Sequence, residues 1–384
     1  MKIFFISRGW PSEREPQWGC FERDQALALK KLGHEIVVLS VDARFRRYYR
    51  KYGITREVHD GITHYNLYAG FWWGRALRTI SVSMHAYIGG RLLYYLYNKV
   101  LKQEGKPDLL YSHYLWCSSM ALAVKQKYGI PLVGMEHWSE LGYGDIKPQW
   151  KKWASMVYQE LDLLLTVSSA LQQNIKKNIG VDSVVVNNMI GGEFCYQPQD
   201  RHDDTVRFVS TGNLLPVKGF DILIEAFYKV GLPMDKWTLA IVGGGNEHDR
   251  LEGLIRQYDL GENITLTGRK DRSGVIEVLR ESDIYIMSSL SETFGVAAVE
   301  ALACGLPAIC TECGGSADFM NEKNGVTCPP GDVAKMAESI DYMFQHYKEY
   351  DRKAIAAECR EKFSSEHIGK KLDRILEEII NAKK

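Results

Sequence analysis

Short apolar runs alternate with segments of helical periodicity along the first half of the chain. Each run is nearly continuous, which is typical of strands buried in a parallel sheet between covering helices. These strand-like runs lie at residues 2–7, 35–40, 109–111, 131–134 and 163–167. A helical segment near 20–33 separates the first two runs, and further helical segments fill the other gaps. The alternation predicts an α/β domain with a parallel sheet.

The same alternation starts again in the second half. Its strand-like runs lie at residues 206–212, 237–243, 264–268, 283–287 and 308–311. Between the two series, residues 191–205 contain two glycines, a proline and a charged polar run, a composition typical of a linker. We therefore predict two doubly wound Rossmann-like domains that face a central cleft. The first should span 1–195 and the second 196–363.

Composition agrees with this picture and excludes some classes of protein. The chain has 384 residues, of which 45% are hydrophobic and 25% charged, as expected for a soluble protein of two or three domains. No run of 18 apolar residues occurs, and the run at 2–7 is too short for a signal peptide, so neither a spanning helix nor secretion is expected. The eight cysteines are scattered, and the Cys310/Cys313 pair has no second pair or nearby histidine. We interpret them as thiols in a reducing cytoplasm.

Two glutamates flank the start of an apolar helix that follows a strand-like run. Glu292 precedes the helix, and Glu300 lies about two turns inside it, since a helix rises about 1.5 Å per residue. The amides of Phe294, Gly295 and Val296 are expected among those left without a partner at the helix N-terminus, where the helix dipole attracts anions such as phosphate. The segment therefore predicts a phosphate site with an acidic hydrogen-bond acceptor on each side, which suits a nucleotide-sugar.

This stretch resembles the E-x7-E element of retaining glycosyltransferases of the GT-B fold, family 4. The resemblance covers most of the chain and is strongest from 206 to 330. It implies that Glu300 holds the ribose hydroxyls of the donor nucleotide and that Glu292 lies by the donor sugar. It also implies that the last helix, at 364–384, returns to the first domain. An amphipathic helix with two solvated acids is the alternative interpretation.

A second element with this resemblance follows the strand-like run at 206–212. The sequence Gly-Asn-Leu-Leu-Pro-Val-Lys-Gly resembles the family's Gly-Arg-Leu-x-Pro-x-Lys-Gly, in which the arginine and lysine clamp the donor diphosphate. Lys218 matches the lysine, whereas Asn213 stands where arginine is usual. Either Lys218 works with backbone amides alone, or another cation such as Arg269 compensates. A surface turn with a solvated lysine is the alternative.

Two residues of the first half complete the candidate site. His137 follows the strand-like run at 131–134, where family members commonly place a histidine that can bond a sugar hydroxyl near the reacting carbon. A core histidine is the alternative. In the loop after the first strand, the family carries a Gly-Gly pair close to the donor phosphate and the acceptor, and here Trp18 and Gly19 take that place. Gly19 would keep the close approach of the backbone.

Charge is balanced overall but unevenly spread. Residues 1–195 carry 25 lysines and arginines against 17 acids, and residues 196–384 carry 23 against 31. A basic half indicates an anionic partner, with ordinary solvated faces as the alternative. Cations alternate with aromatic residues at 44–51, and 71–73 is Phe-Trp-Trp, a composition that suits a membrane interface or a lipid-diphosphate acceptor. No nucleic-acid recognition motif is present, so nucleic acid is not expected as a partner.

Together these features predict a retaining hexosyltransferase of the cytoplasm, at the inner face of the membrane. Its donor would be a nucleotide-diphosphate sugar, UDP- or GDP-linked, and its acceptor a glycan or lipid-linked molecule of polysaccharide or glycolipid biosynthesis. His137, Lys218 and Glu292 are the predicted catalytic residues. Because no Asp-x-Asp motif appears, no metal ion is expected in the reaction, and no cofactor besides the co-substrate.

Three alternatives stay open from the sequence. A GT-B nucleotide-sugar epimerase would use the same donor site. An NAD-dependent oxidoreductase would need a G-x-G-x-x-G fingerprint, and the glycine turn at 243–245 breaks that spacing. A non-catalytic sugar-binding protein would not need Glu292, Lys218 and Glu300 together.

Overall fold

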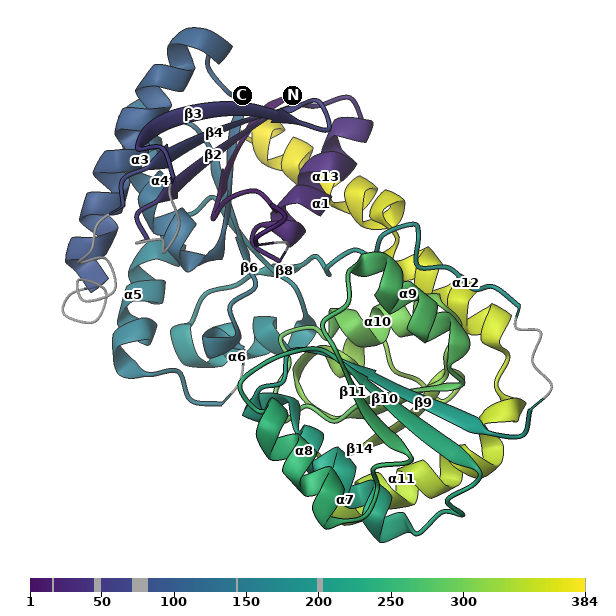
Figure 1. Ribbon diagram of the computed structural model, residues 1–384. Coiled ribbons are helices and arrows are strands. Elements are labelled where there is room, and N and C mark those ends of the chain that lie inside the picture. The colour runs from purple at the N-terminus through teal and green to yellow at the C-terminus, as the bar shows by residue number, and fades with distance from the viewer. Residues whose placement is uncertain (16, 45–49, 71–81, 143, 199–202, 384) are drawn as a thin grey trace. The chain divides into compact units, whose positions relative to one another are not determined.

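The computed structural model describes residues 1–384 apart from positions 16, 45–49, 71–81, 143, 199–202 and 384 (Figure 1). The chain divides into two compact units. The first comprises Met1–Met189 together with Ser365–Lys384, and the second comprises Ile190–Ser364. The chain therefore passes from the first unit to the second between residues 189 and 190 and returns between 364 and 365. The sequence predicted these boundaries at 195/196 and 363/364.

The sheet of the first unit has the strand order β3-β4-β2-β1-β5-β6-β7-β8. Neighbouring strands are parallel except β3 and β4, which are antiparallel. The strands are β1 (Lys2–Ser7), β2 (Glu35–Asp42), β3 (Gly53–His59), β4 (Ile62–Tyr68), β5 (Leu109–His113), β6 (Leu132–Glu136), β7 (Leu163–Thr166) and β8 (Val184–Val185). From β1, the parallel strands are added first towards β2 and β4 and then towards β5, β6 and β7, so the direction of winding reverses between β1 and β5.

The central strand β1 shows why these apolar runs form a covered sheet. Ile3, Phe4, Phe5 and Ile6 are all at most 1% exposed, so both faces of the strand are buried. Phe4 packs edge-on against Tyr97 on one side. Continuous burial on both faces requires helices on both sides of a parallel sheet.

The helices that accompany this sheet include one from the end of the chain. They are α1 (Cys20–Lys31), α3 (Val82–Glu104), α4 (Tyr114–Tyr128), α5 (Pro148–Tyr158), α6 (Ser169–Ile179) and α13 (Ser365–Asn381). In Figure 1 α13, in yellow, lies beside α1. Gly369 lies against Ala28, where a Cβ would meet the alanine methyl at 3.1 Å, and His34 Nε2 lies 2.7 Å from Asp373 Oδ1. The last helix thus packs on the first unit.

The hairpin of β3 and β4 has no counterpart among the elements expected from the sequence. Asp60 and Gly61 join the two strands with φ of 51° and 70°, the left-handed pair that a two-residue hairpin turn needs. Strand β3 has no fully buried residue, so it lacks an apolar run like those that predict β1, β2, β5, β6 and β7. Strand β4 is largely buried, but His64 and Asn66 interrupt its apolar residues. The hairpin places polar side chains at one end of the sheet.

The second unit contains a parallel sheet of order β11-β10-β9-β12-β13-β14. Its strands are β9 (Val206–Thr211), β10 (Trp237–Val242), β11 (Ile264–Gly268), β12 (Ile284–Met287), β13 (Ala308–Thr311) and β14 (Gly325–Cys328). Its helices are α7 (Phe220–Val230), α8 (His248–Gln257), α9 (Arg272–Glu281), α10 (Val296–Ala303), α11 (Val333–His346) and α12 (Arg352–Phe363). The winding reverses between β9 and β12, as in Rossmann domains. The predicted α/β class with two Rossmann-like domains is confirmed.

Candidate functional site

The candidate site of the second unit is built on two loops at the point where its sheet reverses. One loop follows β9 and carries Asn213 and Lys218, and the other follows β12 and carries Glu292. Because connections diverge on either side of such a point, a crevice opens beyond the carboxyl ends of the two strands, and ligands of open α/β sheets bind there. The sheet topology therefore brings the two loops, which are far apart in the sequence, to neighbouring strand ends.

A close backbone contact fixes the two loops against each other. Gly219 has φ of 62°, and a Cβ at this position would lie 2.3 Å from the carbonyl oxygen of Ser288. The Leu290 amide donates to the Val217 carbonyl at 2.8 Å, and Ser288 Oγ donates to the Lys218 carbonyl at 2.9 Å. Only glycine fits both the left-handed turn and this contact. The loop that carries Lys218 is thus held on the loop that carries Glu292.

Lys218 and Glu292 form an ion pair, and the structure brings these two predicted residues together. Lys218 Nζ lies 2.5 Å from Glu292 Oε1, and Ser289 Oγ donates to the same oxygen at 2.8 Å. The two side chains are 25% and 16% exposed, so the pair is mostly buried but still reaches solvent. Both contacts go to Oε1, which leaves the second carboxylate oxygen for a ligand hydroxyl.

The helix α10 begins directly after this pair. Gly295 is its N-cap with φ of 96°, a value that glycine tolerates best, so the sharp entry of the chain into the helix explains this glycine. Phe294 is 2% exposed and packs edge-on against Phe319, so its side chain belongs to the core and only its backbone could meet a ligand. The amides of Val296 and Ala297, the first two of α10, have no acceptor within the helix, as at any helix N-terminus, whereas the Ala298 amide donates to the Gly295 carbonyl at 3.0 Å.

Glu300 lies further along α10 and shares a neighbour with Glu292. Burial raises the pKa of the Tyr285 hydroxyl, and the nearby charges of Glu292 and Glu300 add to this effect. The Tyr285 hydroxyl also lies 3.3 Å from Thr211 Oγ1, at the end of β9. Both predicted glutamates are therefore close enough to Tyr285 to influence the pKa of its hydroxyl.

The structure also brings Arg269 to Asn213. Arg269 Nη2 donates to Asn213 Oδ1 at 3.4 Å, and the arginine side chain runs past Gly244, where a Cβ would lie 2.8 Å from its Cγ. In the same turn, a Cβ at Gly243 would lie 1.8 Å from the Gly212 carbonyl oxygen. The glycines therefore serve close packing within the protein, and Arg269 is an exposed cation beside the position where the family resemblance would place one.

His137 lies in the first unit, at the end of β6, in a stack of rings. It is 7% exposed, and its ring is parallel to that of Phe21 at 5.6 Å. His113 Nδ1 lies 3.1 Å from His137 Nε2, and burial lowers the pKa of His137 well below its ordinary value, so both rings are neutral near pH 7. This is the environment of a core histidine, and its contact with a sugar stays a prediction.

Gly19 takes part in the packing of its own loop. Its φ is 84°, and a Cβ would lie 2.3 Å from the carbonyl oxygen of Gly9. Trp18 Nε1 donates to the Arg8 carbonyl at 2.7 Å, which closes the loop. The backbone at Gly19 is therefore in close contact with another group, as expected, but that group is the Gly9 carbonyl of the same loop and not a ligand.

Sequence reasoning missed the charged groups beneath this loop. Arg8 pairs with Glu22, which is 1% exposed, at 2.9 Å, and its guanidinium lies 3.7 Å from the centre of the Tyr114 ring. Glu22 lies on α1 on the face that the apolar pattern assigns to the core. An acidic residue at a core position of an amphipathic helix could have indicated a buried ion pair here.

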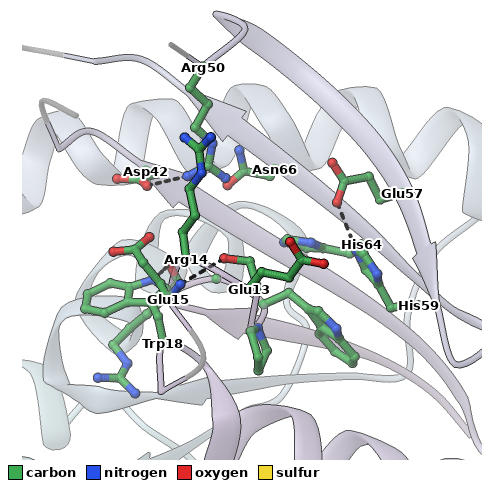
Figure 2. Close-up of a pocket in the computed structure, with 15 residues that line it drawn as sticks. Glu13, Arg14, Glu15, Trp18, Asp42, Arg50, Glu57, His59, His64 and Asn66 are labelled. Carbon is green, nitrogen blue, oxygen red and sulfur yellow. Dashed lines mark hydrogen bonds and ion pairs between the residues drawn. The ribbon is translucent and has the colours of Figure 1, made fainter. Parts of the chain in front are cut away.

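The same loop borders a pocket of about 470 Å³ between the first loop and the hairpin of β3 and β4 (Figure 2). Both arginines and acids line this pocket. The arginines are Arg8, Arg14 and Arg50, and the acids include Asp42 and Glu57. Arg50 donates to Asp42 Oδ2 at 2.9 Å, so this arginine of the predicted membrane-contacting cluster faces the pocket.

Residues 45–49 and 71–73 of the predicted membrane surface lie outside the described residues. Arg44 is described and also pairs with Asp42, with Nε 3.0 Å from Oδ1. Among the described helices, none combines the length and the apolar character that a membrane crossing requires.

Comparison with known proteins defines the class. Residues 196–360 match the family Glycosyl transferases group 1, and residues 23–191 match Glycosyltransferase Family 4. Together with the two Rossmann-like units, these matches identify the chain as a protein of the GT-B glycosyltransferase class.

Individual relatives are distant. Glycogen synthase from Mycobacterium tuberculosis is 26% identical over 266 residues, which are 66% of this chain and 64% of that protein. TuaC from Bacillus subtilis, a glycosyltransferase assigned to teichuronic acid biosynthesis, is 27% identical over 88% of each chain. Among solved structures, sucrose-phosphate synthase from Thermosynechococcus elongatus matches all of both chains with a TM-score of 0.81 at 17% identity. Anabaena HepE in complex with UDP and glucose has a TM-score of 0.71 at 17% identity, over 98% of this chain and all of that one.

Proposed function

We propose that this chain is a retaining hexosyltransferase that moves a sugar from a UDP- or GDP-sugar to a glycan or lipid-linked acceptor in polysaccharide or glycolipid biosynthesis. The observation that carries the proposal is the Lys218–Glu292 pair beside the first turn of α10, where the sheet reverses. A cation and helix N-terminal amides suit a diphosphate, and an adjacent carboxylate suits the hydroxyls of the attached sugar. The solved complex of Anabaena HepE with UDP and glucose supports a donor of this kind.

Departure of the nucleoside diphosphate is the step that the second unit would assist. As the bond from the anomeric carbon to the phosphate oxygen breaks, negative charge grows on the phosphate. Lys218 and the first amides of α10 would stabilise that charge. A lysine ammonium has three N–H donors, and Glu292 engages one of them, so two can reach phosphate oxygens. Arg269, hydrogen-bonded to Asn213, would supply a second cation.

The carboxylates would orient the two ends of the donor. Glu292 is held through Oε1, and its Oε2 would accept a hydrogen bond from a hydroxyl of the donor sugar. Glu300 would accept hydrogen bonds from the ribose hydroxyls. As the family resemblance implies, the acceptor would attack on the face from which the diphosphate leaves, so the configuration of the sugar is retained without an enzyme nucleophile.

The first unit would bind the acceptor, with His137 and the loop at Gly19 near the reacting sugar. Its basic excess favours an anionic acceptor, since residues 1–195 carry 25 lysines and arginines against 17 acids.

Replacement of Glu300 by alanine tests the donor site directly. Loss of hydrogen bonds to a charged acceptor costs about 1.5–3 kcal/mol, so UDP or GDP should bind about 10- to 150-fold more weakly. Isothermal titration calorimetry measures this affinity, with circular dichroism to verify folding. Glu277→Ala, at an exposed position of α9, is the matched control and should bind like the wild type. An unchanged affinity in folded Glu300→Ala protein would refute the assignment.

Turnover should survive chelation, because Lys218 and the α10 amides take the place of a metal ion at the diphosphate. Acceptor-dependent release of nucleoside diphosphate is the measurement, since it also separates a transferase from an epimerase. Loss of this activity in EDTA, with recovery on addition of a divalent ion, would contradict the expectation that turnover needs no metal.

Membrane contact of the first unit is a proposal that rests on sequence. Each basic residue near an anionic surface contributes about 1 kcal/mol, so Arg46→Glu with Arg47→Glu should weaken binding to anionic liposomes at least about 30-fold. Lys151→Glu with Lys152→Glu, on the exposed face of α5, makes the same charge change elsewhere and is the control. Equal liposome sedimentation of the two double variants, or none by the wild type, would favour a soluble acceptor.

A further inference from the structure

Three side chains that can ligate a metal lie on one face of the hairpin of β3 and β4. Glu57 and His59 are two residues apart on β3, so they point to the same side of the strand. His64 on β4 pairs directly with Glu57 across the antiparallel ladder. The spacing Glu-x-His, a two-residue turn and a returning His therefore gathers a carboxylate and two imidazoles.

The three groups are already within reach of a common ion. Glu57 Oε2 lies 2.9 Å from His59 Nε2, and one ligand atom from each of Glu57, His59 and His64 lies within 4.8 Å of the others. Figure 2 shows them together on one wall of the pocket, which all three line. Trp10 covers the group from another side, with its ring stacked on His59 at 5.6 Å.

The hairpin that carries these residues is clamped at its turn. Lys30 Nζ on α1 donates to the Asp60 carbonyl at 2.6 Å, and Arg23 Nη2 donates to Asp60 Oδ2 at 3.1 Å. A turn held to a helix by two cations restricts the movement of the strand ends beside it. His59 immediately precedes this turn, so the site stands on a fixed scaffold.

A buried hydrogen-bond chain orients the His64 ring. Ser40 Oγ donates to Asn66 Oδ1 at 2.8 Å, so Ser40 accepts the hydrogen from His64 Nε2 at 2.7 Å. The three residues are at most 4% exposed. With the proton of the neutral ring on Nε2, Nδ1 keeps the lone pair that a metal needs. Hydrogen bonds of this kind to the second ring nitrogen accompany histidine ligands in metal sites.

We propose that Glu57, His59 and His64 hold a divalent first-row transition metal, most naturally Zn²⁺, with an open coordination position towards the 470 Å³ pocket. Two imidazoles and one carboxylate are a ligand set that zinc accepts, and three protein ligands leave a fourth position for water or an anionic group of a ligand. The residues of this site all belong to the first unit, whereas Lys218, Glu292 and Glu300 belong to the second.

The test is a titration of the full-length, tag-free protein with Co²⁺, which reports the site by visible absorption, followed by displacement with Zn²⁺. The wild type should take up one Co²⁺ in a tetrahedral or five-coordinate site, and Zn²⁺ should abolish the absorption. His59→Gln and Glu57→Gln, at half-buried and exposed positions, should each weaken Co²⁺ binding at least 100-fold. Ser40→Ala should weaken it about 10- to 100-fold, because it removes the partner that orients His64.

The matched control is His346→Gln. His346 Nδ1 lies 2.9 Å from Glu349 Oε1, the same distance as in the Glu57–His59 pair, but on the exposed end of α11 in the second unit. This variant should bind Co²⁺ like the wild type. Absence of Co²⁺ absorption in the wild type, or equal binding by the wild type and His59→Gln, would overturn the proposal. Buried His64 is left unchanged, so misfolding does not obscure the result.

Discussion

The contact between the loops after β9 and β12 is the constraint on which the candidate donor site depends. Gly219 lies against the backbone of Ser288, and this contact places Lys218 beside Glu292. Both loops leave the sheet where its winding reverses, so the same point carries the ion pair and the start of α10. A side chain at Gly219 would force the loops apart and separate the cation from the carboxylate. The proposed chemistry therefore begins with a backbone contact, before any side chain meets a ligand.

Much of the second unit could be predicted from sequence, because local signals and tertiary structure agree there. Five of its six described strands coincide with predicted runs, whereas the short edge strand β14 (Gly325–Cys328) was not predicted. Helix α10 follows the second of the two loops that the motifs mark. The sequence could not predict that Lys218 pairs with Glu292, or that Arg269 reaches Asn213, because these contacts join segments more than 50 residues apart. The family resemblance implied that they share a ligand, and the fold supplies the distances.

The first unit was less predictable, for two physical reasons. Strand β3 lies at the edge of its sheet and is mostly polar, so it has no apolar run, although its partner β4 is buried. The stacked rings of His137 and Phe21 and the Arg8–Glu22 pair come from separate elements, and nothing in the local pattern indicates that they meet. The proposed metal ligands were missed for the same reason, because their spacing acquires meaning only once the hairpin turn at Asp60 is known. The two units thus differ in how far local sequence determines their functional surfaces.

A double-mutant cycle on Lys218 and Glu292 tests the central claim most directly. Lys218→Met, Glu292→Gln and the double variant would be compared for affinity towards UDP and GDP by calorimetry. If the pair acts as one unit at the diphosphate, the two effects are not additive, with a coupling free energy of about 0.5–3 kcal/mol, as for other residues in contact. Effects that add to within about 0.5 kcal/mol, or nucleotide affinity unchanged in all three variants, would contradict the account.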